Sequence, residues 1–263
     1  MKTLELTHIL ARIIKAKRRR VEDSRIRVPE AIVRNMASVT PRPISFHDAI
    51  GATGARRIIA EVKKASPSGG VLAEELDVEA LARAYAGAGA AAISVVTEQD
   101  FFRGNLGWVK KAGEASRLPV LRKDFVFDRY QIFETRAAGA SAVLLIVAML
   151  RTEELKALLA SAGEVGLDAV VEVHDEAELE EALEAGATIV GVNNRNLKTF
   201  DVSLETSARL GKMIPDGVLF VAESGIHCRK DIDFLTEAGA DAFLIGEHFV
   251  TSPDPATTLR GLL

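Results

Sequence analysis

The chain has 263 residues, of which 48% are hydrophobic and 27% are charged, and this globular composition excludes a disordered protein. Its 33 lysines and arginines stand against 37 aspartates and glutamates, and a net charge of −4 favours neither nucleic acid nor an anionic membrane as a partner. The single cysteine, Cys228, excludes a disulfide framework within the chain and a multi-cysteine metal site.

The first fifty-odd residues predict a helical extension. Its start has charged and polar residues where a secretory signal needs an unbroken apolar run, so we expect a cytoplasmic protein. Apolar residues from Leu6 to Val21 fall at helical spacing and predict an amphipathic helix. The run KAKRRR within it is the most basic part of the chain, and we expect a solvated helix face there. Pro41 and Pro43 break the helical pattern and mark a connector.

An Ala-Gly-Ala element followed by an apolar run occurs four times along the rest of the chain. The central glycines are Gly89, Gly139, Gly186 and Gly239, with spacings of 50, 47 and 53 residues. Each follows a helix-like stretch and precedes a buried-looking strand, so we expect each glycine to end a helix in the left-handed conformation. Fifty residues is too long for one βα unit, and a further apolar run lies in each interval.

These runs predict eight strands, which lie near Ile58, Ala92, Val120, Ala142, Ala169, Ile189, Leu219 and Ala242. Continuous apolar strands with room for one helix between neighbours are typical of a parallel sheet buried on both faces. We expect a (β/α)8 TIM barrel with an N-terminal helical extension; a doubly wound open sheet is the alternative, weakened by the lack of a glycine fingerprint after the first strand. The whole chain is expected to be a single domain, with the extension and connector at 1–57, the barrel at 58–263 and no fused second enzyme. The longest uncharged apolar stretch, residues 137–150, is too short to span a bilayer.

Active sites of such barrels lie at the carboxyl ends of the strands. Glu61 and Lys63 are two residues apart and face the same side of the first strand, and Glu172 lies within an apolar strand. A buried carboxylate needs a partner, and we expect Lys63 and Lys123 to supply it. Lysines and glutamates that shift one another's pKa values are suited to acid–base catalysis, although a structural ion-pair network is the alternative.

Further patterns at the strand ends suggest what the site holds. The glycines in ESGI and IGEHF, after the seventh and eighth strands, lie where barrel enzymes bind phosphate. The five histidines lack close ligand spacing, so no metal site is expected. His174, two residues after Glu172, is expected in a surface loop, with a position at the mouth of the barrel as the alternative. Two phenylalanine pairs, at 101–102 and at 125 and 127, are either loop anchors or the walls of an aromatic pocket.

Six segments in order resemble the indole-3-glycerol phosphate synthase family: IIAEVKKASPSGG, VLRKDFVFDRYQI, VVEVHDEAELEEAL, VGVNNRNLKTFDV, VAESGI and FLIGEHFV. The resemblance runs from about Pro41 to the C-terminus, and the helical extension is similar to the one the family carries. It implies a lyase of tryptophan biosynthesis that cyclises 1-(2-carboxyphenylamino)-1-deoxyribulose 5-phosphate to indole-3-glycerol phosphate with loss of CO2 and water. No metal or organic cofactor is implied.

The resemblance also implies partners. They are the phosphorylated small-molecule substrate and, beyond it, other enzymes of the tryptophan pathway, with no nucleic acid and no membrane. The chain is expected to be a monomer or a weak homo-oligomer.

Roles for single residues follow from the same resemblance. It implies that Lys123 is the general acid that protonates the ribulose carbonyl, that Glu172 transfers protons, and that Lys63 stabilises developing charge and assists loss of the hydroxyl. Two further residues, Glu61 and Asn193, are implied to orient these groups. The implied substrate-binding residues are Ser66, Phe102, Phe125, Leu144, Arg195, Glu223 and Ser224, and the implied phosphate-binding residues are Gly225, Gly246 and Glu247.

Two positions depart from the family pattern. Gly69 stands where the family usually has a lysine or arginine, and His248 follows Glu247 where a small residue is usual. Two rival functions remain open from the residues themselves: a Schiff-base aldolase on a sugar phosphate, which would use Lys123 or Lys63, and a catalytically silent barrel that serves as a partner subunit.

Overall fold

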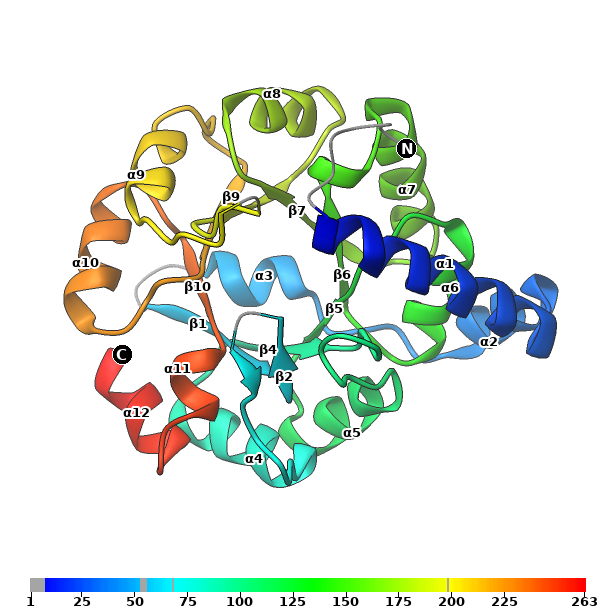
Figure 1. The fold of residues 1–263 in the computed structure, drawn as a ribbon, viewed down its shortest axis with the longest axis horizontal. Coiled ribbons are helices and arrows are strands. Elements are labelled where there is room, and N and C mark those ends of the chain that lie inside the picture. The colour runs from blue at the N-terminus through cyan, green and yellow to red at the C-terminus, as the bar shows by residue number, and fades with distance from the viewer. Residues whose placement is uncertain (1–7, 53–55, 68, 198) are drawn as a thin grey trace.

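The computed structural model describes residues 8–52, 56–67, 69–197 and 199–263 (Figure 1). Eight parallel strands form a closed barrel in the order β1-β10-β9-β8-β7-β6-β5-β4. The strands are β1 (Arg57–Val62), β4 (Ala92–Val96), β5 (Val120–Lys123), β6 (Ala142–Ile146), β7 (Asp168–Val173), β8 (Ile189–Asn193), β9 (Leu219–Glu223) and β10 (Ala242–Ile245). Each of the eight expected strand positions lies inside one of these strands. The predicted barrel is therefore confirmed, and the alternative prediction of a doubly wound open sheet is wrong.

Helices surround the ring of strands (Figure 1). They are α1 (His8–Arg27), α2 (Glu30–Val39), α3 (Phe46–Gly51), α4 (Val78–Ala88), α5 (Gly107–Ser116), α6 (Arg129–Ala137), η1 (Val147–Met149), α7 (Thr152–Glu164), α8 (Glu176–Glu184), α9 (Glu205–Gly211), α10 (Arg229–Glu237), α11 (Glu247–Val250) and α12 (Pro255–Leu262). The four repeat glycines follow α4, α6, α8 and α10 with φ of 101°, 84°, 87° and 97°, which confirms their predicted left-handed conformation. A short antiparallel pair, β2 (Ala65–Ser66) and β3 (Gly70–Val71), was not predicted.

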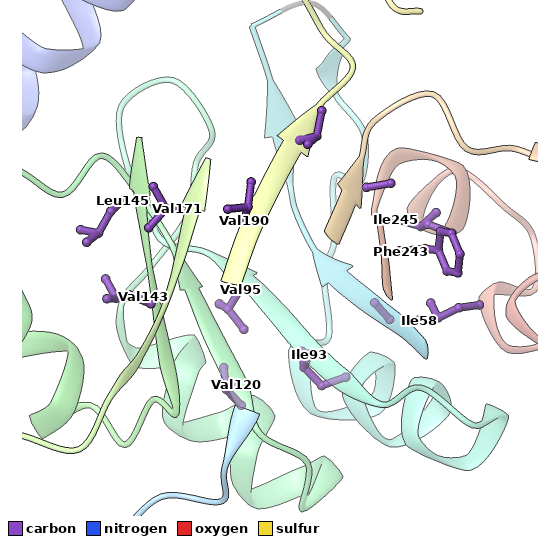
Figure 2. Close-up of a cluster of buried hydrophobic side chains, with 14 of the residues drawn as sticks. Ile58, Ile93, Val95, Val120, Val143, Leu145, Val171, Val190, Phe243 and Ile245 are labelled. Carbon is purple, nitrogen blue, oxygen red and sulfur yellow. The ribbon is translucent and has the colours of Figure 1, made fainter. Parts of the chain in front are cut away.

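The strand residues alternate between two apolar layers. Ile59, Leu121 and Val170 point into the barrel, where they belong to one buried cluster. Their neighbours along the strands, such as Ile58 and Val171, belong to a second cluster that joins the strands to the surrounding helices (Figure 2). Both faces of the sheet are therefore buried, as the continuous apolar strands predicted.

The N-terminal extension contacts both ends of the barrel. Helix α3 lies at the amino end, where Phe46 and Ile50 are fully buried and Asp168, the first residue of β7, accepts the N–H groups of Phe46 and His47 at 2.9 and 3.0 Å. Helix α1 lies at the carboxyl end, because Lys17 bonds to Asp124, the residue after β5, at 2.8 Å.

Helix α1 is amphipathic as predicted, with Leu10, Ile13, Ile14 and Val21 buried; Leu6 lies outside the described residues. The solvated face expected for KAKRRR is wrong at Lys17, which is 5% exposed. A buried lysine needs an anion, and Asp124 supplies it. No helix in the described ranges is both long and apolar enough to cross a membrane.

Candidate active site

A cavity of about 330 Å³ opens at the carboxyl ends of the strands. Its lining includes every site residue named from the sequence: Glu61, Lys63, Ser66, Phe102, Lys123, Phe125, Leu144, Glu172, Asn193, Arg195, Glu223, Ser224, Gly225, Gly246 and Glu247. They come from all eight strands or the loops after them, so the barrel topology brings together residues far apart in sequence.

Lys123, the last residue of β5, lies between two carboxylates. Its Nζ donates to Oε2 of Glu172 at 3.0 Å and to Oε2 of Glu223 at 2.8 Å. Burial disfavours the charge on Lys123, but Glu172, Glu223 and Glu61 more than offset this effect and raise the pKa of the ammonium above its usual value. Lys123 is therefore a protonated acid held in place from two strands.

Glu172 has a donor group on each oxygen. Oε2 accepts from Lys123, while Oε1 accepts from Nδ2 of Asn193 at 3.1 Å and lies 3.2 Å from Nε2 of His174. Burial favours the neutral acid, but Lys123 and His174 outweigh it and hold the pKa of Glu172 well below its usual range. Asn193 is itself fixed, because its Oδ1 accepts from the hydroxyl of Ser224 at 2.9 Å and from the N–H of Arg195 at 3.0 Å.

Glu223 is the carboxylate whose protonation is displaced the other way. Burial and the negative charge of Glu172 raise its pKa to about 7, although Lys123 opposes the shift. The neighbouring strand makes room for the side chain through Gly191, where an added Cβ would lie 2.4 Å from Oε1 of Glu223. Two carboxylates on one lysine thus have their pKa values pushed apart, which is an arrangement suited to acid–base chemistry.

Lys63 and Glu61 form the second ion pair, with Nζ 2.8 Å from Oε2. This contact confirms the prediction that Glu61 and Lys63 face the same side of the first strand. Glu61 is 2% exposed and fits only because residue 246 is a glycine, since an added Cβ there would lie 2.2 Å from Oε2 of Glu61. The first and eighth strands are thus matched to each other at the mouth of the barrel.

An apolar wall lies on the other side of the cavity. Phe102 and Phe125 stand with ring centroids 6.1 Å apart, and Leu144 from β6 lines the cavity with them. The buried carboxylate of Glu98 fixes the loop of Phe102 by accepting the N–H groups of residues 100, 101 and 102. The other member of each phenylalanine pair contacts α1 instead, since Phe101 lies under Arg12 and Phe127 under Arg18.

The glycine-rich end of the cavity follows β9 and β10. Ser224 and Gly225 both have positive φ, 68° and 79°, so the chain turns sharply there. Arg195 approaches Glu247 at 3.9 Å. His248, noted above as a departure from the family pattern, and His227, which the sequence did not single out, also line this end, with ring centroids 5.5 Å apart.

Other features of the site were not predicted from the sequence. His174 is not in an exposed loop: its side chain is 11% exposed and contacts Glu172, so that expectation is wrong. Thr97 and Asp124, at the ends of β4 and β5, belong to a buried network beside the site. Asp124 accepts from Lys17, Thr97 and Arg122, and these bonds outweigh its burial and lower its pKa to about 2. The D-x-x-E spacing of Asp175 and Glu178, directly after His174, was the only local signal that His174 has a buried partner.

Among the described residues, no cluster of three or more histidine, cysteine or acidic side chains has the arrangement of a metal site.

Comparison with known proteins identifies the fold and the family of the chain. Solved structures with similar folds include KGPDC from Streptococcus mutans, with a TM-score of 0.61, 12% identity and coverage of 80% of this chain and 96% of that one. A second is mandelate oxidase with benzoyl-formic acid, with a TM-score of 0.60, 17% identity and coverage of 86% and 74%. At these identities they show the barrel fold alone.

The sequence model described as indole-3-glycerol phosphate synthase matches residues 10–262. The indole-3-glycerol phosphate synthase of Chlorobium phaeovibrioides is 50% identical over 246 residues, which cover 93% of this chain and 95% of that protein. That of Roseiflexus sp. (strain RS-1) is 48% identical over 262 residues and 97% of each chain. By its fold and its relatives the protein is thus a lyase built on a barrel. It belongs to the indole-3-glycerol phosphate synthase family.

Proposed function

We propose that this cavity converts 1-(2-carboxyphenylamino)-1-deoxyribulose 5-phosphate to indole-3-glycerol phosphate, with Lys123 as the general acid. The reaction joins an aromatic carbon to a ketone carbon and then loses CO2 and water. It therefore needs a proton donor at the ketone oxygen, a proton acceptor, an apolar pocket for the ring and an anchor for phosphate. The single observation that carries the proposal is Lys123 held between Glu172 and Glu223, beside the aromatic wall of Phe102 and Phe125.

The first step follows from the position of Lys123. As the aromatic carbon that bears the carboxylate attacks the ketone carbon, the Lys123 ammonium donates a proton to the ketone oxygen, which becomes a hydroxyl. The new C–C bond is followed by loss of CO2, whose bonding electrons return to the ring. Holding both reacting carbons in one enclosed pocket supplies proximity as well as acid catalysis.

The second step is dehydration. The ring nitrogen pushes out the hydroxyl, which leaves as water with a proton from Lys63, and Glu172 accepts the proton that the adjacent methylene carbon loses. Glu61 holds Lys63 at 2.8 Å and Asn193 holds Glu172 at 3.1 Å, so both act on orientation. Ser66, Leu144, Arg195, Glu223 and Ser224 complete the substrate pocket.

The phosphate is proposed to bind at Gly225, Gly246 and Glu247, through backbone N–H groups. In support, Ser224 and Gly225 form a sharp turn and, with Gly246 and Glu247 at the start of α11, line this end of the cavity. Backbone donors do not depend on the side chain at residue 248, so this part of the proposal is unaffected by the departure there.

We further propose that the extension and the barrel form one domain, since the buried pair of Lys17 and Asp124 joins them. A cytoplasmic location agrees with the unpaired, exposed Cys228. We propose a monomer or weak homo-oligomer whose protein partners are other enzymes of the same pathway.

The test is to incubate the purified protein with the carboxyphenylamino substrate and follow indole fluorescence. We expect product and equimolar CO2 from the wild type. Borohydride is added in parallel with a keto-sugar phosphate, because an aldolase would be trapped as a covalent adduct on Lys123 or Lys63. Absence of product, or a trapped lysine adduct with turnover of the keto-sugar phosphate, would contradict the proposal.

A further inference from the structure

His174 directly follows β7 and its ring lies between two carboxylates. Nδ1 lies 2.9 Å from Oε2 of Glu178, and Nε2 lies 3.2 Å from Oε1 of Glu172. All three side chains are largely buried, with exposures of 11% for His174, 16% for Glu178 and 4% for Glu172. His174 is not part of the cavity lining, so it lies behind the carboxylate that faces the substrate.

Glu178 is held in place by backbone hydrogen bonds as well as by its contact with the His174 ring. It lies in the first turn of α8, and its own N–H donates to Oδ1 of Asp175, the residue that caps this helix, at 2.9 Å. Its Oε2 also accepts the backbone N–H of His174 at 2.9 Å. One carboxylate oxygen therefore binds both the backbone and the ring of His174, which leaves the ring little freedom to turn away from Glu172.

We propose that Glu178 and His174 form a positioning pair that holds Glu172 ionised and oriented for proton transfer; this rests on the proposed function. A neutral imidazole protonated at Nδ1 would turn a lone pair on Nε2 toward a carboxylate oxygen, which is unfavourable. The doubly protonated ring instead donates a hydrogen bond from Nδ1 to Glu178 and places the positive charge of its Nε2–H group 3.2 Å from Glu172 as an ion pair. Glu172 then has positive charge on both sides, from Lys123 in the cavity and from His174 behind it.

The charges around the ring support this protonation state. Burial lowers the pKa of His174, but Glu172 and Glu178 more than compensate and raise it to about 10. The other charged groups nearby act through Glu172: Lys123 binds its opposite oxygen, and Glu223 binds Lys123. The positive charge of His174 stabilises the ionised form of Glu172, whereas burial alone would favour the neutral acid.

The first experiment measures the charge on His174 without reference to activity. The imidazole ¹⁵N signals are followed against pH in the full-length protein, and His174 is assigned by comparison with His174→Gln. We expect two protonated ring nitrogens up to at least pH 9. Titration of His174 near its ordinary value of about 6.5 would overturn the proposal.

The second experiment measures kinetics in His174→Gln and Glu178→Gln. We expect each to lower kcat by about tenfold or more with KM within twofold, because Glu172 is displaced while the cavity lining is intact. Loss of one adjacent positive charge should also move the acidic limb of the kcat profile to higher pH, by up to about one to two pH units. The double variant should be no worse than the poorer single variant, because the two residues act as a unit.

Matched controls keep the result specific. Glu184→Gln alters an exposed glutamate on the same helix, which pairs with Lys156, and His47→Gln alters a histidine at the opposite end of the barrel. Both should leave kcat unchanged. Unchanged kcat and pH profile in Glu178→Gln, the variant that keeps the imidazole, would overturn the proposal even if His174→Gln failed to fold. A wild-type protein with no synthase activity would instead refute the proposed function, while the ¹⁵N titration would still decide the state of the pair.

Discussion

At the amino end of the barrel the strands are closed by Phe46 and Ile50 of α3, both fully buried, whereas Glu61, Lys123 and Glu172 lie in the last two residues of their strands at the carboxyl end. At the carboxyl end, charged groups are paired at 2.8–3.0 Å around a cavity. The comparison teaches that one end is built for apolar packing, whereas the other carries the energetic cost of buried charge and is where we propose the chemistry.

The largest expected effect comes from removing the charge at the centre of the carboxyl end. Lys123→Ala should lower kcat by about 10³-fold or more, because the general acid is lost. Steady-state kinetics with the carboxyphenylamino substrate measure this change. Thermal unfolding of the same variant is the control, and a protein that has merely unfolded would lose its transition altogether.

The matching change at the amino end is Phe46→Ala. It should lower the free energy of unfolding by about 3–5 kcal/mol through the cavity it leaves, with kcat at 25 °C within about twofold of the wild type. Denaturant unfolding measures the first quantity and steady-state kinetics the second. Val39→Ala, at an exposed position of α2, is the control and should change stability by less than about 0.5 kcal/mol. If kcat of Phe46→Ala were as low as that of Lys123→Ala, the proposed difference in role between the two ends of the barrel would be contradicted.

Lys17 sharpens the comparison because it belongs to the extension but binds under the carboxyl end. Lys17→Met should cost about 3 kcal/mol of unfolding free energy, at the low end for a broken buried pair, since Asp124 keeps Arg122 and Thr97 as partners. Lys15→Met, on the exposed side of the same helix, is the control in the same unfolding experiment. Equal effects of the two changes would show that the buried pair does not join the extension to the barrel.

The pH dependence of stability gives a smaller effect, confined to the carboxyl end. The pKa of Glu223 is raised to about 7 in the folded protein, above its usual 4.5, so the folded state binds this proton more tightly than the unfolded state. The stability it contributes is complete below about pH 4.5 and is lost as the pH rises through 7. In denaturant unfolding between pH 5 and 6.5, Glu223→Gln should show a flatter dependence than the wild type, and an identical slope would contradict the assignment.

The smallest effect is expected at Cys228, which is exposed and precedes α10. Cys228→Ser should change the unfolding free energy by no more than about 0.5 kcal/mol, because serine also accepts a hydrogen bond at a helix N-terminus. Activity should be unchanged in the same preparation. A large loss of kcat would indicate that the thiol contributes to the carboxyl end.

The two ends also differ in how far the sequence predicts them. The Ala-Gly-Ala repeats mark the strands because glycine ends a helix at a fixed point before each one, and residues two apart, such as Glu61 and Lys63, necessarily share a face. The pairing of Lys123 with Glu172 followed from the cost of a buried charge. Which further carboxylate would reach Lys123 did not follow, since Glu223 lies 100 residues away.

Long-range contacts of the extension were out of reach for the same reason. Lys17 meets Asp124 across 107 residues, and a basic run on a helix is more often a solvated face. His174 was misjudged because its burial depends on the packing of α8 against β7. The strand count and the charged face were therefore predictable from periodicity, whereas the partners of single charges required the three-dimensional structure.

The most direct test of the account compares the rate of indole-3-glycerol phosphate formation by the wild type, Phe46→Ala and Lys123→Ala at 25 °C. We predict that the first two form product at rates within about twofold of each other and that Lys123→Ala is slower by about 10³-fold or more. Equal rates for Lys123→Ala and the wild type would contradict the claim that the charged carboxyl end of the barrel performs the chemistry.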